Sequence, residues 1–283
     1  RPQSSPPSRR SALVETCSIL RHSDNFRPGQ LSMERVVKII VCIKRVPDTE
    51  SRIRVAGNGI DPAGIKYIIS PYDEFALETA LRLKEAKGEG DVVVISVGDS
   101  SAQEQLRSAL AMGADSAVLL KGEVTLDGLA TARALAAEIR DAGADLVLLG
   151  MKAADDDQQQ VGPMLAELLD LPCVTVAGSV ELEESAIICH REIEGGVEVI
   201  EAPLPAVVTI TKGKWDPRYP SLKGIMAAKK KPLEEKPAQL GESRIELREL
   251  SAPPERPAGR IVGNGVEGVT ELVRVLREEA KVL

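Results

Sequence analysis

Short apolar runs alternate with helical patterns along the first half of the chain. The apolar runs cover residues 37–46, 92–97, 117–120 and 146–149. Between them apolar residues recur every three or four positions, as Ala76, Ala80 and Leu83 do. Buried strands that alternate with amphipathic helices are typical of βαβ units. The pattern therefore predicts an α/β fold built on a parallel sheet.

Polar residues at the ends of the helical patterns predict where the helices begin and stop. The expected N-terminal caps are Ser70 with Asp73, Ser100 with Gln103, and Asp157 with Gln160. Pro71 suits the first position of its helix, and Gly113 is placed to end the second helix. A third helix is expected over residues 127–142.

The pattern changes after Pro172. Residues 174–182, 187–193 and 197–201 alternate like strands, and Glu194, Gly195 and Gly196 predict a hairpin between the last two. A β-rich edge or subdomain is therefore expected. Prolines recur between residues 231 and 260, which predicts an extended arm, and residues 266–282 predict one amphipathic helix. We expect an α/β domain over 33–230, and an arm with a C-terminal helix over 231–283. The arm could dock on a partner subunit or on its own domain.

Residues 1–32 have a different composition from the rest. They hold five Arg, seven Ser and four Pro against two acidic residues, with no periodic apolar pattern. One interpretation is a non-native or disordered extension in front of Met33. The other is an organellar transit peptide, which is rich in Arg and Ser and poor in acids. The expected location is the bacterial cytoplasm in the first case and the mitochondrial matrix in the second.

Composition narrows the function classes. The chain has 36 basic and 43 acidic residues, a formal charge of −7, so no basic excess is available for nucleic acid. Its apolar runs are too short for direct insertion into a membrane, which needs about 18 apolar residues. The four cysteines form no CxxC pair, which argues against a zinc site and a disulfide framework.

Candidate catalytic chemistry is sparse. His190 is the one histidine after Met33, and no obvious nucleophile and base pair accompanies it. Residues 263–268 match G-x-G-x-x-G, but only 15 residues follow, too few for a dinucleotide-binding unit. The sequence predicts that the chain is not an enzyme and uses no catalytic residues or metal of its own.

One candidate binding segment follows a buried strand and enters a helix. Free N–H groups at such a helix start favour a nucleotide phosphate. Its three adjacent carboxylates would repel phosphate unless they face amides, hydroxyls or a cation. The alternative is that the segment only caps the helix, with the remaining acidic side chains exposed to solvent. The segment consists of Gly150, Met151, Lys152, Ala153, Ala154, Asp155, Asp156, Asp157, Gln158, Gln159, Gln160 and Val161.

A second candidate is a proline-bounded loop over residues 214–222. Trp215, Arg218 and Tyr219 are residue types that are enriched at binding hot spots. We expect an exposed recognition loop, with aromatics folded back onto the core as the alternative.

Taken together, these segments resemble the β subunit of electron transfer flavoprotein. The similarity is carried, in order, by residues 41–48, 70–74, 109–115, 150–162, 205–209, 218–222 and 225–231. It covers essentially all of residues 33–283. The resemblance implies a Rossmann-like, adenine-nucleotide-hydrolase-like domain whose C-terminal arm docks on an α subunit.

The resemblance also implies the cofactors. The α subunit would hold most of an FAD at the interface, and this chain would bury a structural AMP. The AMP pocket would use Cys42, Ser70, Pro71, Tyr72, Asp73, Val97 and the 150–161 segment. Tyr72 would also lie toward the flavin. Many members carry an aromatic residue after the aspartate that matches Asp48, where this chain has Thr49.

The implied activity is electron transfer from acyl-CoA and related dehydrogenases, as in fatty acid oxidation, to a membrane quinone oxidoreductase. Leu222 would anchor the dehydrogenases. A flavin-bifurcating relative with a second FAD in place of AMP is the first alternative: Gly162 and Pro163 favour it, and the unbroken run 155–157 opposes it. A stand-alone nucleotide-binding domain is the second. An adenylating enzyme would need a Ser- and Gly-rich pyrophosphate loop, which the sequence lacks.

Overall fold

The computed structural model describes residues 37–122, 127–255 and 258–283. The interpretations of residues 1–32 concern a segment outside these ranges. In the described part, no helix combines the length and the apolar character needed to cross a membrane.

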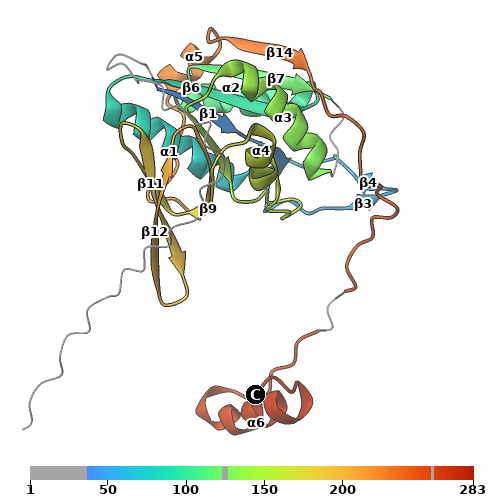
Figure 1. Ribbon diagram of the computed structural model, residues 1–283. Coiled ribbons are helices and arrows are strands. Elements are labelled where there is room, and N and C mark those ends of the chain that lie inside the picture. Colours follow the sequence, from blue (N-terminus) through green and yellow to red (C-terminus); the bar gives the residue numbers. More distant parts are fainter. Residues whose placement is uncertain (1–36, 123–126, 256–257) are drawn as a thin grey trace, which may run out of the picture. The chain divides into compact units, whose positions relative to one another are not determined.

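A seven-stranded parallel sheet forms the centre of the fold (Figure 1). Its strands lie in the order β14-β7-β6-β1-β8-β13-β9. They are β1 Lys38–Cys42, β6 Asp91–Gly98, β7 Ser116–Lys121, β8 Leu146–Gly150, β9 Cys173–Ala177, β13 Ala206–Ile210 and β14 Leu233–Pro237. The central strands are nearly continuous runs of Ile, Val and Leu because helices cover both faces. The predicted α/β class is confirmed.

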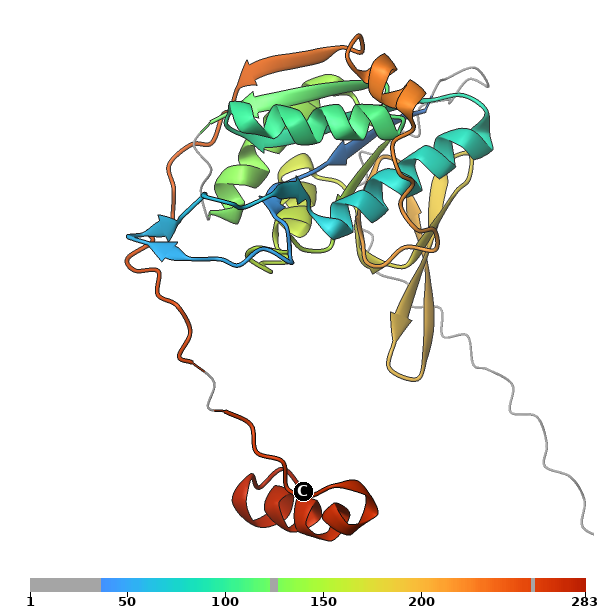
Figure 2. The same ribbon diagram turned by 180° about the vertical axis from the view of Figure 1, so that it is seen from behind.

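Two pairs of helices cover the two faces of this sheet. Helices α1 (Pro71–Lys87) and α2 (Gln103–Met112) pack on one face and appear in front of the sheet in Figure 2. Helices α3 (Gly128–Ala142) and α4 (Val161–Leu169) pack on the other. Alternate residues of β1 belong to the two cores: Val41 faces the first pair and Ile40 the second.

Several predicted helix ends are confirmed, but the predicted capping side chains at three helix starts do not form their caps. Helix α1 begins at Pro71, and Gly113 follows the last residue of α2. Asp127 caps α3 by accepting the N–H groups of Leu129 and Ala130. The capping box at Ser100 does not form: Asp99 caps a short 3₁₀ turn, Ser100–Ala102, and α2 starts only at Gln103.

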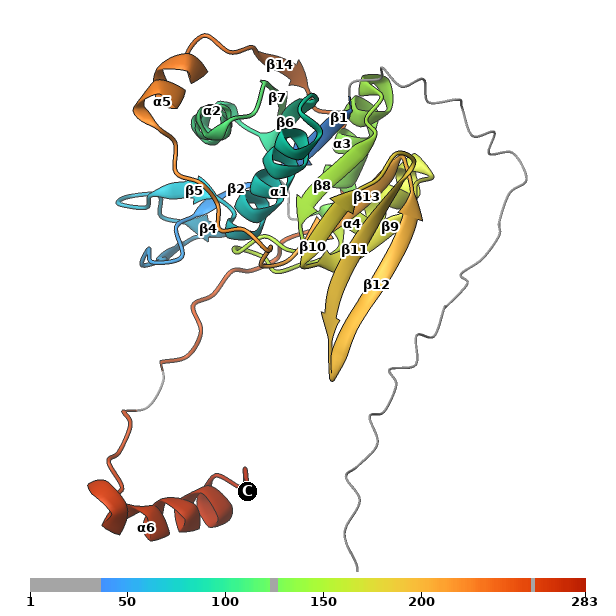
Figure 3. The same cartoon turned by 90° about the vertical axis from the view of Figure 1, so that its left-hand side faces the viewer.

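The smaller sheets lie beside the main one (Figure 3). The predicted hairpin joins β11 (Ala186–Ile193) to β12 (Gly196–Pro203), and β10 (Ser179–Leu182) completes an antiparallel sheet. The two remaining pairs are β2 (Arg45–Pro47) with β5 (Tyr67–Ile69), and β3 (Val55–Ala56) with β4 (Gly59–Ile60).

Two predicted strands are each divided in the structure. Residues 174–182 belong to β9 and β10, which lie in different sheets on either side of Gly178. Residues 37–46 likewise divide into β1 and β2. In residues 174–182 the apolar alternation continues through the break, so the periodicity there gives no sign that the chain changes partner. In residues 37–46 the break falls where Lys44 and Arg45 interrupt the apolar run.

The described region after β13 contains five further elements. Helix α5 (Leu222–Ala228) precedes β14, which pairs with β7 as an edge strand that the sequence pattern did not predict. The expected helix over 266–282 is shorter: a 3₁₀ turn (Gly265–Glu267) leads into α6 (Gly268–Arg274), and a π-helical turn (Val275–Glu279) follows. The division at residue 230 and the docking of the arm on a partner stay predictions.

Candidate functional site

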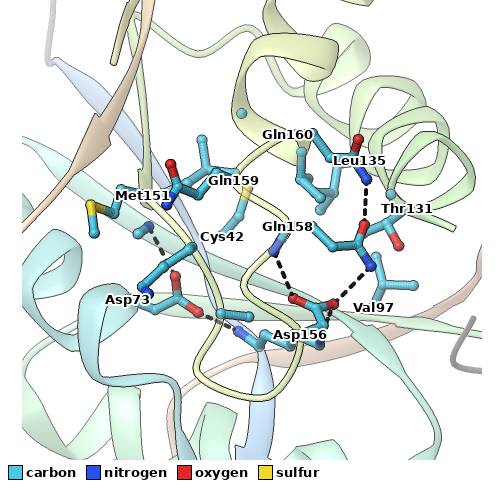
Figure 4. Close-up of a pocket in the computed structure, with 18 of the residues that line it drawn as sticks. Cys42, Asp73, Val97, Thr131, Leu135, Met151, Asp156, Gln158, Gln159 and Gln160 are labelled. Atoms are coloured by element: carbon cyan, nitrogen blue, oxygen red, sulfur yellow. Dashed lines mark hydrogen bonds and ion pairs between the residues drawn. The ribbon is translucent and has the colours of Figure 1, made fainter. Parts of the chain in front are cut away.

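A pocket opens at the carboxyl ends of β1, β6 and β8 (Figure 4). Its empty volume is about 860 Å³, which includes open solvent at its mouth. The loop between β8 and α4, the first turns of α3 and residue Leu240 complete its walls. The chain proceeds from β1 to β6 on one side and later to β8 on the other, so this is the topological switch point where α/β proteins usually bind ligands.

The structure brings most of the predicted binding residues together here. Those that line the pocket are Cys42, Asp73, Val97, Gly150, Met151, Lys152, Ala153, Asp156, Gln158, Gln159, Gln160 and Val161. Six others lie beside it without lining it: Ser70, Pro71, Tyr72, Ala154, Asp155 and Asp157. Other residues that line the pocket were not predicted from the sequence: Ile43, Lys44, Gly128, Thr131, Leu135, Leu149, Gly162 and Leu240. Lys44 could have been predicted, because it directly follows a buried strand whose end lies at the ligand-binding edge of the sheet.

Asp73 ties two strand ends together on the floor of the site. Its buried carboxylate accepts the backbone N–H of Lys44 at 2.8 Å and that of Gly150 at 2.9 Å. Burial raises the pKa of Asp73 to about 7, although both hydrogen bonds act in the opposite direction. Asp73 thus does not serve as the helix cap that its position suggested. The Ser70 hydroxyl is also turned away from its helix and accepts the N–H of Ala154 at 3.3 Å.

Two glycines let the backbone approach closely at this site. A Cβ on Gly150 would lie 2.5 Å from Asp73 Oδ1 and 2.7 Å from Tyr72 Cβ. At Gly128 it would lie 2.9 Å from Gln158 Oε1. Larger residues at either position would push polar groups of the pocket out of place.

Two lysines pair with the three adjacent carboxylates and offset two of their three negative charges. Lys44 Nζ lies 2.8 Å from both Asp155 Oδ1 and Asp156 Oδ2, and Lys152 Nζ lies 2.8 Å from Asp157 Oδ2. Burial alone lowers the pKa of Lys44, but its two carboxylate partners outweigh this and raise it. These pairs therefore reduce the repulsion between the acidic run and an anion bound in the pocket.

The start of α4 is left open to a ligand. The predicted cap by Asp157 is wrong because this carboxylate pairs with Lys152 instead, and Gln160 precedes the helix without a capping side-chain bond. Asp157 and Gln159 have positive φ angles of 51° and 57°. Turns of this kind direct successive N–H groups into a concave surface that suits anions.

The remaining walls are inert. Val97, Leu135 and Leu149 supply apolar surface, and burial strongly raises the pKa of the Cys42 thiol, which keeps it protonated and unreactive. His190 lies on β11 and does not line the pocket. Among the described residues, no group of three or more His, Cys, Asp or Glu side chains could hold a metal. The arrangement is suited to holding a ligand.

The second predicted site is divided between exposed and inward side chains. Tyr219 is 95% exposed and Leu222 84% exposed, so Tyr219 does not fold back onto the core. Trp215 is half-buried, with the ammonium of Lys214 5.4 Å from its ring. Arg218 is turned toward Glu78 of α1 at 2.7 Å.

A parallel sheet with helices on both faces and a pocket at its switch point places the chain among the Rossmann-like α/β proteins. Comparison with known proteins narrows this class. The family model of the electron transfer flavoprotein domain matches residues 58–240.

Curated relatives match over most of the chain. It is 43% identical to the electron transfer flavoprotein subunit beta of Syntrophomonas wolfei, over 79% of this chain and 88% of that protein. The corresponding Bacillus subtilis protein is 41% identical, over 87% and 100%. The human one is 40% identical, over 87% and 99%. The chain belongs to the electron transfer flavoprotein family as a β subunit, which confirms the resemblance seen in its sequence.

Proposed function

We propose that this chain is the β subunit of a heterodimeric electron transfer flavoprotein. With an α subunit it holds FAD, which supplies one-electron redox chemistry. The complex carries electrons from acyl-CoA and related dehydrogenases to a membrane quinone oxidoreductase. The chain contributes binding and positioning and no catalytic side chain of its own, which agrees with the inert walls of the pocket.

The switch-point pocket is the observation that carries this proposal. Structural AMP fits the residues present: apolar walls for the base, an uncapped start of α4 for the phosphate, and acids already paired with lysines. Gly150 and Gly128 let the backbone come close to Asp73 and Gln158, which keeps these two side chains in the pocket wall. Ser70, Pro71 and Tyr72 would support the pocket from behind, with Tyr72 toward the flavin.

A flavin-bifurcating complex with a second FAD in this pocket is the second candidate. Gly162 and Pro163 in the first turn of α4 favour it. The intact acidic run favours AMP, since Asp157 pairs with Lys152 of the same loop, Asp155 and Asp156 pair with Lys44 after β1, and one helix start is left for one phosphate.

Partner docking is assigned to the loop before α5. Tyr219 and Leu222 offer large apolar groups to solvent, and such groups anchor protein interfaces when they fill a pocket on the partner. Leu222 would be the anchor for the dehydrogenases.

The experiment is to purify the chain with its α subunit, denature the complex and identify the released nucleotides by mass and absorbance. One FAD and one AMP per heterodimer supports the proposed shuttle. Two FAD and no AMP replaces it with bifurcation. A stable lone chain without nucleotide contradicts both and leaves the stand-alone nucleotide-binding domain.

A further inference from the structure

Arg218 lies in the segment that joins β13 to α5, and its side chain is directed at α1. It donates five hydrogen bonds to two carboxylates of that helix, those of Glu78 and Glu85. Its Nε lies 2.7 Å from Glu78 Oε2, and its Nη1 lies 2.6 Å from Glu85 Oε1. One of the five bonds comes from the backbone N–H of Arg218, which donates to Glu78 at 3.2 Å. One residue therefore fixes both the main chain and the side chain of the loop on α1.

The Glu78 carboxylate makes this contact strong. Its side chain is 0% exposed, and Arg82 of the same helix is its second partner, at 2.6 Å. Burial raises the pKa of Glu78, but the hydrogen bonds from Arg218 and Arg82 outweigh it and keep the pKa below its ordinary value. Because a buried carboxylate that loses a partner is strongly destabilising, the loop is held firmly against the helix.

The residues that follow Arg218 do little to hold the loop. Tyr219, Leu222 and Met226 are 95%, 84% and 72% exposed. Side chains with this exposure gain little from hydrophobic burial. The backbone of α5, which carries Leu222 and Met226, is held on α2 at its far end, where Ala228 is buried and accepts a hydrogen bond from Arg107 at 2.7 Å. Arg218 fixes the other end, where the loop enters this helix. A contiguous set of large exposed apolar groups marks an interaction surface.

We infer that Arg218 is a positioning residue that presents this surface to the dehydrogenase in its binding conformation. The inference rests on the proposed function and gives Arg218 an intramolecular role. A loop ordered in advance avoids the cost of ordering side chains during association. Lysine cannot replace Arg218 in full, since one ammonium has three donors and lacks the planar fork that makes two bonds to each carboxylate.

The test uses the purified heterodimer as electron acceptor for an acyl-CoA dehydrogenase and measures KM for the heterodimer and kcat separately. Arg218→Gln should raise KM about tenfold, which is the effect of re-ordering a few side chains on binding. We expect kcat, FAD content and reduction by dithionite to be unchanged. The matched control is Arg82→Gln, which removes the same charge from the same cluster without releasing the loop and should leave KM unchanged.

A double-mutant cycle with Leu222→Ala separates positioning from direct contact. If Arg218 acts by placing Leu222, the two substitutions raise KM by less than the product of their separate effects. Equal KM values for Arg218→Gln and wild type, with a raised KM for Leu222→Ala, overturn the inference and leave the proposed function standing. A wild-type complex that no acyl-CoA dehydrogenase reduces overturns the proposed function itself. Should Arg218→Gln fail to fold, Glu85→Gln removes only the exposed half of the contact and should raise KM about threefold.

Discussion

Replacing Gly150 by alanine should disturb the centre of the pocket. The added Cβ would lie 2.5 Å from Asp73 Oδ1, 2.7 Å from Tyr72 Cβ and 2.8 Å from the Asp73 N–H nitrogen. Strand β8 cannot retreat, because it is paired with β1 on one side and β13 on the other. The start of α1 must therefore move, and with it the carboxylate that joins the two strand ends.

The magnitude follows from the contacts that are lost. Overpacking of a tight site costs about 1–3 kcal/mol. A hydrogen bond to a charged group contributes about 1.5–3 kcal/mol, and Asp73 would lose at least one of its bonds to Lys44 and Gly150. We expect Gly150→Ala to lower the free energy of unfolding by about 3–5 kcal/mol. AMP should be lost with it, since the same loop forms the pocket wall.

Urea unfolding of the heterodimer and the AMP to FAD ratio after gel filtration measure both effects. Gly178→Ala is the matched control, because its Cβ would meet nothing closer than the carbonyl oxygen of His190 at 3.6 Å. A Gly150→Ala complex that keeps its AMP and lies within about 1 kcal/mol of wild type would refute the reasoning, since surface substitutions without such contacts cost about that little.

Three further predictions concern the same pocket. The pKa of Asp73 is raised to about 7 in the folded state, so between pH 5.5 and 7 the folded chain keeps a proton that the unfolded chain releases. The free energy of unfolding should therefore fall by about 1–2 kcal/mol as pH rises from 5.5 to 7. Urea unfolding at several pH values measures this decrease, which Asp73→Asn should lack. Lys44→Met leaves Asp155 and Asp156 without their shared cation, so AMP retention on dialysis should fall at least about tenfold while FAD stays bound. Asp127→Asn keeps an oxygen to cap α3 but places an amide nitrogen against the N–H of Arg244. The substitution should loosen the arm that carries Leu240 and so increase the rate of AMP exchange, measured with labelled AMP. The melting temperature should stay nearly unchanged.

The local sequence was sufficient for most elements of the fold. Continuous apolar runs located β1, β6, β7 and β8, and the period of 3.6 residues located the helices that cover them, because burial on one or both faces follows directly from the order of residues. Pro71, Gly113 and Asp127 marked helix ends correctly because a cap depends on only the next few residues. The strand that precedes the pocket and the helix that follows it were located in the same way.

Only the tertiary structure decided which partner each polar group takes. Lys44 meets Asp155 across 111 positions, and Asp73 reaches Gly150 across 77. The hydroxyl of Ser70 and the carboxylate of Asp73 could have capped α1, yet both bond to groups brought in by β1, β8 and the loop after β8. The edge strand β14 likewise depends on β7 being within reach. Periodicity records whether a residue is buried, whereas a hydrogen bond depends on which distant donor the packed strands place beside it.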